Sequence, residues 1–558
     1  MSSIQVEKKQ KSLQKKLRVI DIWALGVGIV VSGQYFGWNL GLNGNGPVAM
    51  LIASMIICLL FLGWVLTLAE LSVAMPHADG PLAYGERTGG PWLGFTMAWS
   101  MLLECLFGMI ATSLATGWYM ALLANPENPQ DEPALIILSG LATVAVFFVL
   151  HAWGVKEQSV VLVLMTYAAL LGLLLFWGIS AADFSAERIW AVPVLGDKGW
   201  RGVLDAAPFA LWWLINIEGA ALASEETAVP FQTIPRGLVL SMLTIITLIG
   251  LTLLLGCGSM PWQDIVGDYP LAKVVLHALD GRYPLLWHLF CGIALFGLIA
   301  SYHGLLYSTS RQLFSLGRAG YLPAVLGKAH ASRGTPVVSL FACSLVAGCF
   351  VIASVWFKEA IELAILVAGL ASLVWYILAM FCLWTLRRRS PHLFSHYRAP
   401  LARTLPIVVV GFSGFVLLGY IGKSNAVEIF LIAAVLYLAG LVCFVVWGRR
   451  QIRVNDSMAM DGSCPALAMP PPRRESVLEW FTVPVLWLTL LVPGWIIVAS
   501  FWPQLPRFSS NEVEAVIVLA LIGLSLGLVC LVAWLHTQPR QVTKTILSPA
   551  ESHRENTV

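Results

Sequence analysis

Long apolar segments, each about 20 residues in length, recur along most of this sequence. A helix of about 20 residues is needed to cross the roughly 30 Å hydrocarbon layer of a bilayer. Of the 558 residues, 58% are hydrophobic and only 12% are charged, and the mean hydropathy is +0.79. This composition excludes a soluble globule of this size and predicts an all-α polytopic membrane protein.

Fourteen apolar segments are predicted to be membrane spans. They lie near residues 20–42, 48–73, 91–124, 133–153, 157–180, 207–228, 236–259, 284–312, 336–356, 360–386, 404–421, 425–448, 477–502 and 513–536. About three quarters of the 34 Lys and Arg residues fall on the side that holds both termini. Because cytoplasmic loops are rich in Lys and Arg, we predict a multi-pass protein of the cell (inner or plasma) membrane with both termini in the cytoplasm. The arginines after the tenth span, at positions 387, 388, 389, 398 and 403, are interpreted as part of this topological signal.

Composition divides the chain into five parts. A basic cytoplasmic tail (1–19) precedes a twelve-span core (20–452); a Pro- and Arg-rich cytoplasmic linker (453–475), two additional spans (476–537) and a second cytoplasmic tail (538–558) follow. Nine of the ten cysteines fall in predicted spans and none forms a CxxC pair, so neither a disulfide framework nor a zinc site is expected. The motifs of hydrolases, ATPases and metalloenzymes are absent from the sequence. We therefore expect no enzymatic activity, cofactor, bound metal or nucleic-acid partner.

Two predicted spans are interrupted in the middle. The first carries VVSGQYFGWNLGLNG, with a glycine at every fourth position from Gly33, and the sixth carries Asn216, Glu218 and Gly219 in otherwise apolar sequence. Unwound backbone survives inside a bilayer only where it lines a cavity or contacts a ligand. Because five spans separate the two breaks, we predict an inverted repeat of two five-helix halves with discontinuous helices one and six. The alternative for the first break is a helix kink packed through its GxxxG pattern.

Both breaks are predicted to lie near the bilayer centre, where helix ends offer free N–H and C=O groups to a ligand. Glu218 is the strongest candidate, since a buried carboxylate needs a partner such as an ammonium; the alternative is a carboxyl that stays protonated or bonds to the unwound backbone. Glu104, near the middle of span three, is a second candidate for ligand binding. The alternative is that Glu104 makes a structural hydrogen bond to the first or eighth helix. The predicted substrate-binding residues are Ser32, Gly33, Gln34, Tyr35, Glu104, Trp212, Asn216, Ile217 and Glu218.

Without a nucleotide-binding motif, energy for transport must come from a gradient or from exchange. Glu218 and His303 are the predicted proton-coupling residues, because an imidazole titrates near physiological pH, although a lone buried histidine is more often structural. A sodium site would use carbonyls of span one and Ser301 of span eight. Sodium is therefore kept as an alternative to protons as the coupling ion. Aromatic residues beside the breaks, Tyr35, Phe36, Trp38, Trp212 and Trp213, are candidates for cation–π contact with an amine.

Residues 18–450 resemble the amino acid, polyamine and organocation permease superfamily. The resemblance is carried by GVGIVVSGQYFGWN, AELSVAMPHADGPLAYGER, IEGAALASEETAVPFQTIPRG and SRQLFSLGRAGYLP. The segments YFGWN, IEGAA and SYHGLLYSTSRQLFSLGRAGYLP are similar to those of the ethanolamine permease branch. This resemblance implies import of an alkanolamine, with Glu218 beside the amine. The chain departs from that branch at neutral Gln34, where an acidic residue is usual, and this leaves amino acids open as substrates.

The sequence therefore predicts a secondary active transporter, a symporter or exchanger that imports a small amine or amino acid by alternating access, with an ethanolamine-like substrate favoured. The alternatives are a general amino acid permease of the same superfamily and a transporter-fold sensor that binds ligand without flux. The short tails disfavour a sensor. The clustering of polar residues at one depth disfavours a channel. The lipid bilayer is an expected partner, and the oligomeric state is left open.

Overall fold

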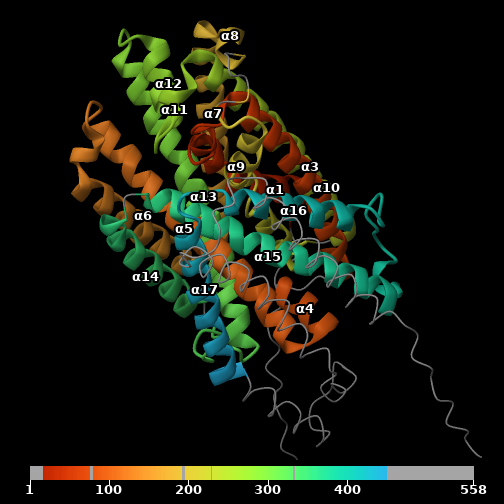
Figure 1. Ribbon diagram of the computed structural model, residues 1–558. Helices are drawn as coiled ribbons and strands as arrows, with labels where there is room; N and C mark the ends of the chain where they lie inside the picture. The colour runs from red at the N-terminus through yellow and green to blue at the C-terminus, as the bar shows by residue number, and fades with distance from the viewer. Residues whose placement is uncertain are drawn as a thin grey trace, which may run out of the picture. The chain divides into compact units, whose positions relative to one another are not determined.

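A computed structural model describes residues 17–75, 79–190, 195, 197–227, 229–330, 333–357 and 359–448. All of these residues belong to one compact unit, Met1–Glu475, whereas the second unit, Ser476–Val558, lies outside the described residues. The described part is helical, with one isolated bridge between Leu17 and Thr227 and no strand (Figure 1). The prediction of an all-α protein is confirmed for this part of the chain.

Nine helices of the described part are long and apolar enough to cross a membrane. They are α3 (Gly46–Ala74), α5 (Pro91–Ala124), α6 (Pro133–Trp153), α7 (Val155–Ser180), α10 (Pro230–Ser259), α13 (Pro284–Arg318), α14 (Val337–Ala353), α15 (Ala360–Arg389) and α17 (Ala426–Cys443), the last of which continues as a π-helical turn (Phe444–Gly448). Four of the chain's prolines, Pro91, Pro133, Pro230 and Pro284, open such helices, because proline at the first helical position gives up no hydrogen bond.

The predicted spans at 20–42, 207–228 and 404–421 consist of shorter helices. The first comprises α1 (Val19–Val30), α2 (Ser32–Tyr35) and the 3₁₀ helix η1 (Trp38–Leu42). The sixth comprises α9 (Trp200–Leu211) and the 3₁₀ helix η4 (Ile217–Glu226), and the eleventh is α16 (Leu405–Ile421). The two spans predicted after residue 475 lie outside the described residues.

The remaining described elements are short and connect the long helices. They are α4 (Pro81–Gly89), α8 (Ala186–Ile189), α11 (Trp262–Ile265), α12 (Pro270–Leu279) and the 3₁₀ helices Pro129–Asp131, Ala181–Asp183, Ser354–Trp356 and Pro391–Phe394. α11 and α12 occupy the 260–283 segment, which is predicted to lie on the outer side between spans seven and eight.

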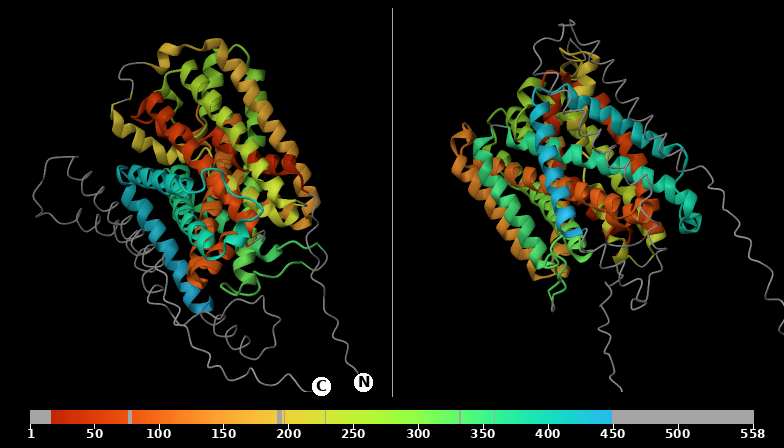
Figure 2. Two further views of the ribbon diagram at one scale, coloured as in Figure 1. Left: turned by 90° about the vertical axis from the view of Figure 1, so that its right-hand side faces the viewer. Right: turned by 60° about the horizontal axis from the view of Figure 1, so that its bottom comes forward.

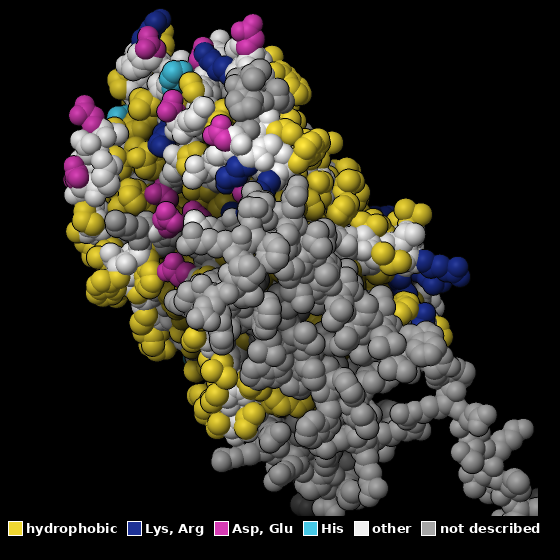
Figure 3. Space-filling view, in the orientation of Figure 1, with side chains coloured by type: hydrophobic (Ala, Val, Ile, Leu, Met, Phe, Trp, Pro, Cys, Tyr) yellow, Lys and Arg dark blue, Asp and Glu magenta, His cyan; other side chains and the backbone are white. Residues whose placement is uncertain are grey.

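Burial separates central helices from peripheral ones. Within the most apolar 18-residue stretch of each helix, 83% of α5 is buried inside the unit, whereas only 22% of α6 is buried. α5 packs along both α13 and α15, and these three helices are the most buried of the long helices, whereas α3 packs along α9 and α10 (Figure 2). Large apolar side chains on α6, α7, α14 and α17 are exposed, and hydrophobic atoms cover much of the sides of the described helices in Figure 3. This outward apolar surface suits contact with lipid.

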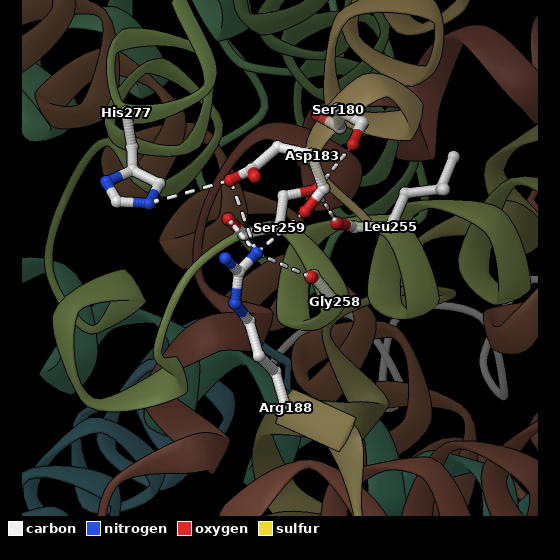
Figure 4. Close-up of polar contacts among 7 residues, drawn as sticks. All are labelled: Ser180, Asp183, Arg188, Leu255, Gly258, Ser259 and His277. Carbon is white, nitrogen blue, oxygen red and sulfur yellow. Dashed lines mark hydrogen bonds and ion pairs between the residues drawn. The ribbon is translucent and has the colours of Figure 1, made fainter. Parts of the chain in front are cut away.

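At the end of the unit predicted to face outside, one arginine caps the end of α10 (Figure 4). Nη1 of Arg188 donates to the carbonyl oxygens of Gly258 (3.0 Å) and Ser259 (2.7 Å) at the last turn of α10, and it lies 3.2 Å from Oδ2 of Asp183. Nε2 of His277 on α12 lies 3.7 Å from the same carboxylate oxygen. Arg188 thus satisfies carbonyls that the end of a helix leaves free.

At the opposite end, residues of two sequence motifs contact each other. The hydroxyl of Ser315 and the guanidinium of Arg318, both in the last turns of α13, donate to Asp79 just before α4. The hydroxyl of Tyr321 donates to Glu86 of α4. Burial is the main cause that raises the pKa of Glu86, and the hydrogen bond from Tyr321 opposes it. The motifs ADGPLAYGER and SRQLFSLGRAGYLP are therefore the two sides of one interface.

Candidate functional site

The interruption of the first span has two parts. At Val31 the hydroxyl of Ser301 on α13 enters the helix: the N–H of Ser32 donates to Oγ of Ser301 (2.9 Å), and this hydroxyl donates to the carbonyl of Gly28 (3.1 Å). In an unbroken helix that N–H would bond directly to the carbonyl four residues earlier. The inserted hydroxyl therefore replaces one helical hydrogen bond at the point where α1 ends and α2 begins.

The non-helical residues of this span are Phe36 and Gly37. Phe36 is extended, with φ −159° and ψ 166°, and Gly37 has φ +90°. A Cβ at Gly37 would also lie 2.5 Å from Cδ1 of Trp212, so only glycine fits here. Within the predicted interruption VVSGQYFGWNLGLNG, Ser32–Tyr35 form one turn of helix, and Phe36 and Gly37 separate it from η1.

The sixth span breaks between the end of α9 at Leu211 and the start of η4 at Ile217. Asn216 adopts the left-handed conformation with φ +74°, which asparagine tolerates better than most residues. The chain continues as a 3₁₀ helix, whose hydrogen bonds connect residues three apart. The backbone N–H groups of 212–215 make turn hydrogen bonds to carbonyls three or four residues earlier, and the N–H of Asn216 donates to a side chain, Glu104.

The two interruptions meet in space. A Cβ at Gly33 would lie 2.9 Å from the carbonyl oxygen of Trp212 and 3.3 Å from Cα of Trp213. The ring of Phe36 lies edge-on to Trp212, with centroids 5.3 Å apart, and Trp38 stacks on Trp213 at 5.0 Å. Backbone of span one therefore lies directly against backbone of span six, and aromatic rings from both segments close around the contact.

This contact gives a stability prediction for Gly33→Ala. The added methyl group would press on backbone atoms, which cannot turn aside as a flexible side chain can, so we expect a destabilisation of roughly 1–3 kcal/mol. Thermal unfolding of the purified protein in detergent is the measurement. Gly411→Ala on α16 is the matched control, because nothing lies within 4 Å of its Cβ position. Equal midpoints for the two variants would contradict close packing of the breaks.

Two glutamates and a tyrosine form a buried cluster beside the second break. Glu104 on α5 and Glu218 on η4 are 0% and 1% exposed. The hydroxyl oxygen of Tyr376 on α15 lies 2.7 Å from Oε1 of Glu218 and 3.2 Å from Oε1 of Glu104. This arrangement brings spans three, six and ten together at one point.

Glu104 also receives two N–H groups. Nε1 of Trp375 donates to its Oε2 (2.6 Å), and the backbone N–H of Asn216 donates to its Oε1 (3.2 Å). One turn further along α5, Gly108 leaves room for the side chain of Asn216, whose Nδ2 would lie 3.1 Å from a Cβ there. The partners of Glu104 thus come from spans six and ten, and not from the first or eighth helix.

Several buried polar atoms at the two breaks make no hydrogen bond to any residue that the structure describes. They are both side-chain amide atoms of Gln34, Oδ1 of Asn216, Oε2 of Glu218 and the indole N–H groups of Trp64 and Trp212. Buried polar groups are nearly always paired, since leaving one unpaired costs about 1–3 kcal/mol. Such a group of atoms is consistent with a site that receives a polar ligand.

The remaining candidates point elsewhere. Tyr35 donates its hydroxyl to the carbonyl of Ala169 on α7 (2.5 Å), on a different side from the glutamate cluster. His303 contacts the ring of His151 on α6. Ile217 is fully buried at the start of η4. The structure therefore brings Glu104, Asn216 and Glu218 into one cluster. Gly33 and Trp212 form a separate contact between the two breaks. Tyr35 and His303 belong to neither group.

Trp64, Trp375 and Tyr376 are members of the cluster that the sequence did not single out. The ring of Trp64 on α3 lies 4.2 Å from that of Tyr376 and 4.7 Å from that of Trp375, between centroids. Aromatic residues are common in membrane helices, and nothing in the sequence around these three separates them from apolar filling. Only their position against the two carboxyl groups reveals them.

Long apolar helices around two interrupted spans, with carboxyl groups buried where the spans break, are the features of a polytopic membrane protein of the permease type. Residues 17–446 match the amino acid permease family, and the chain belongs to this family.

The chain is similar to several bacterial permeases. It is 26% identical over 468 residues to the branched-chain amino acid permease BcaP of Bacillus subtilis, a match covering 80% of this chain and 96% of the relative. It is 26% identical to the methylthioribose transporter of the same organism, over 74% of this chain and 89% of the relative. It is 25% identical to the gamma-aminobutyric acid permease of Escherichia coli, over 75% and 90%.

Proposed function

We propose that the protein is a secondary active transporter that imports a small amine or amino acid, with an ethanolamine-like substrate favoured, by alternating access with proton coupling or exchange. The observation that carries this proposal is the unpaired Oε2 of Glu218, buried at a helix break beside other polar atoms without partners in the described part of the chain. A carboxylate at this depth costs roughly 2.5–3.5 kcal/mol unless it has a partner. An ammonium group of the substrate supplies that partner.

The surroundings of Glu218 suit an ammonium. The rings of Trp64, Trp375 and Tyr376 lie next to the carboxyl pair, and a cation against such faces gains roughly 0.5–2 kcal/mol. The polar end of the substrate would reach the first break, where Ser32, Gly33 and the unpaired amide of Gln34 lie. An alkanolamine and an amino acid share this pattern of one ammonium with a polar group nearby.

An inverted repeat of two five-helix halves is part of this proposal. If spans one to five correspond to spans six to ten, each contact in one half has a counterpart in the other. α1 packs on α10 as α9 packs on α3, and α7 packs on α13 as α15 packs on α5. These paired contacts support the repeat, and with it the rocking of one bundle against the other that alternating access needs.

The leading alternative is a general amino acid permease. The relatives named for branched-chain amino acids and gamma-aminobutyric acid favour it, as does the neutral side chain at Gln34. A sensor that binds ligand without flux is the second alternative.

Purified protein in liposomes tests all three. The proposal expects accumulation of labelled ethanolamine under an imposed pH gradient, acid outside, or exchange against ethanolamine trapped inside. Transport of amino acids alone would select the first alternative. Thermal stabilisation by an amine without flux under any proton or sodium gradient would select the sensor and reject transport.

A further inference from the structure

Asn39 connects the first break to a distant segment on the predicted outer side. Its side chain is 0% exposed and makes three hydrogen bonds, each to a backbone group. Oδ1 of Asn39 accepts from the N–H of Gly37 (3.1 Å), the residue with φ +90° at the break. Nδ2 donates to the carbonyls of Ile265 (2.9 Å) and Gly267 (2.7 Å), which are 226 and 228 residues further along the chain.

The carbonyls of residues 264–267, at the end of α11 and in the turn to α12, are all held by side chains. Nζ of Lys273 on α12 donates to the carbonyls of Asp264 (3.4 Å) and Val266 (2.9 Å), and Asn39 holds the two that alternate with them. Lys273 belongs to the same segment as the turn, whereas Asn39 belongs to span one. Removing Asn39 would therefore detach the turn from span one and leave the bonds from Lys273 that shape it.

The outer segment, which consists of α11, α12 and the turn between them, rests on two groups of helices. The indole N–H of Trp287 on α13 donates to the carbonyl of Ala272 on α12 (3.0 Å), and α12 also packs on α7. α11 instead contacts η1 and α3. The outer segment therefore bridges span eight and span one, and Asn39 ties it to span one.

The position of η1 links Asn39 to both breaks. η1 follows the first break in the chain, and since span one is predicted to run outward, η1 lies on the outer side of that break. Trp38 of η1 stacks on Trp213 of the second break, with centroids 5.0 Å apart. A movement of η1 therefore changes the outer side of both breaks at once, and the turn at 264–267 follows that movement while Asn39 holds it.

We propose that Asn39 is a positioning residue that couples the outer segment to the first break, so that η1 and the turn at 264–267 close the outer side of the substrate site together. Both N–H bonds of its amide are used by the two carbonyls, so Asn39 has no donor left for a substrate. It acts on the closing step and not on binding. The inference rests on the transport function proposed above and names a residue that its alternating access requires.

Asn39→Ala and Asn39→Asp test the coupling in liposomes. Alanine removes all three bonds, whereas aspartate keeps an acceptor for the N–H of Gly37 and loses the amide donors. For both variants we expect the maximal rate of exchange of labelled against trapped substrate to fall at least about tenfold, because the outer side must close in every cycle. The substrate concentration that gives the half-maximal rate should stay within about threefold of wild type.

Asn45→Ala is the matched control. Asn45 is also buried, and its Nδ2 donates to the carbonyl of Gly41 in the same stretch of chain (2.9 Å). The substitution removes the same amide from the outer part of span one and leaves the bonds to the outer segment intact. We expect this variant to exchange substrate at the wild-type rate.

Hydrogen–deuterium exchange measured by mass spectrometry reports on the attachment without transport. In purified Asn39→Ala, peptides that cover residues 262–269 should take up deuterium at least about tenfold faster than in wild type. Peptides that cover residues 272–279 of α12 should keep the wild-type rate, because α12 remains bound to α13 and α7. A general loss of stability would instead raise the rate in both regions.

The results separate the coupling from a structural role. Wild-type maximal rates of substrate exchange in both Asn39 variants would overturn the coupling. Unchanged deuterium uptake at 262–269, or an equal rise throughout the protein, would also overturn it. A wild-type protein that neither exchanges nor accumulates any amine or amino acid would reject the proposed transport function, whereas deuterium uptake would still decide whether Asn39 holds the outer segment.

Discussion

Glu218→Gln will lose amine uptake while the protein still inserts and purifies as wild type does. The glutamine amide has nearly the volume of the carboxyl group and can still contact the hydroxyl of Tyr376, so packing at the break is preserved. It has no negative charge with which to hold an ammonium. Loss of a buried charge contact costs about 2–5 kcal/mol, so we expect uptake at low substrate concentration to fall at least about 30-fold.

Initial rates of labelled amine uptake into liposomes measure this effect, and the amount and monodispersity of purified protein report on folding. Glu428→Gln is a suitable control, because this glutamate lies in the first turn of α17 and away from the acid cluster. Unchanged uptake by Glu218→Gln would reassign the carboxyl group to a structural role and remove the main support for an amine substrate.

Arg387→Met will strongly destabilise the protein. Nη2 of Arg387 lies 2.6 Å from Oε2 of Glu70, and its Nε donates to Oε1 (2.7 Å), so the pair is bidentate. The two side chains are 9% and 0% exposed. Without the arginine, Glu70 would remain buried with the N–H of Ala399 (2.8 Å) as its main donor. Removing one partner of a buried ion pair lowers the free energy of unfolding by about 3–5 kcal/mol.

Thermal or denaturant unfolding in detergent checks the prediction. Arg388→Met is the control, because Arg388 is exposed and stacks on the ring of Trp384, so its loss should cost less than about 1 kcal/mol. The double variant Glu70→Leu with Arg387→Met should recover much of the loss, since no unpaired charge then stays buried. Equal stabilities of the two single arginine variants would show that the ion pair contributes little.

Arg387 also shows where pattern and structure differ. From the sequence, the arginines after the tenth span are interpreted as a topological signal, and Arg388 is exposed in the last turn of α15. Arg387 instead joins the end of α15 to Glu70 of α3. One turn of helix places neighbouring residues on different faces, so a run of identical residues can serve two purposes.

The ends of α5 and α6 were predictable because local chemistry fixes them. Apolar length set α5 at Pro91–Ala124 and α6 at Pro133–Trp153, which are the predicted ranges, and proline opens both. The first interruption lies within the predicted segment VVSGQYFGWNLGLNG, but the break in helical hydrogen bonding at Val31 depends on the hydroxyl of Ser301, which is 269 residues away from Ser32 in the chain. No local pattern contains that contact.

The sequence alone determined that this chain is a helical membrane protein with interrupted first and sixth spans, because hydrophobic length and backbone-breaking residues act within a single segment. It also singled out Glu104 and Glu218, since a carboxyl group in an apolar span is costly wherever it points. Only the tertiary structure decided that the two carboxyl groups share Tyr376, and that Tyr35 and His303 lie elsewhere. The reason is that such contacts depend on how helices distant in sequence turn toward one another.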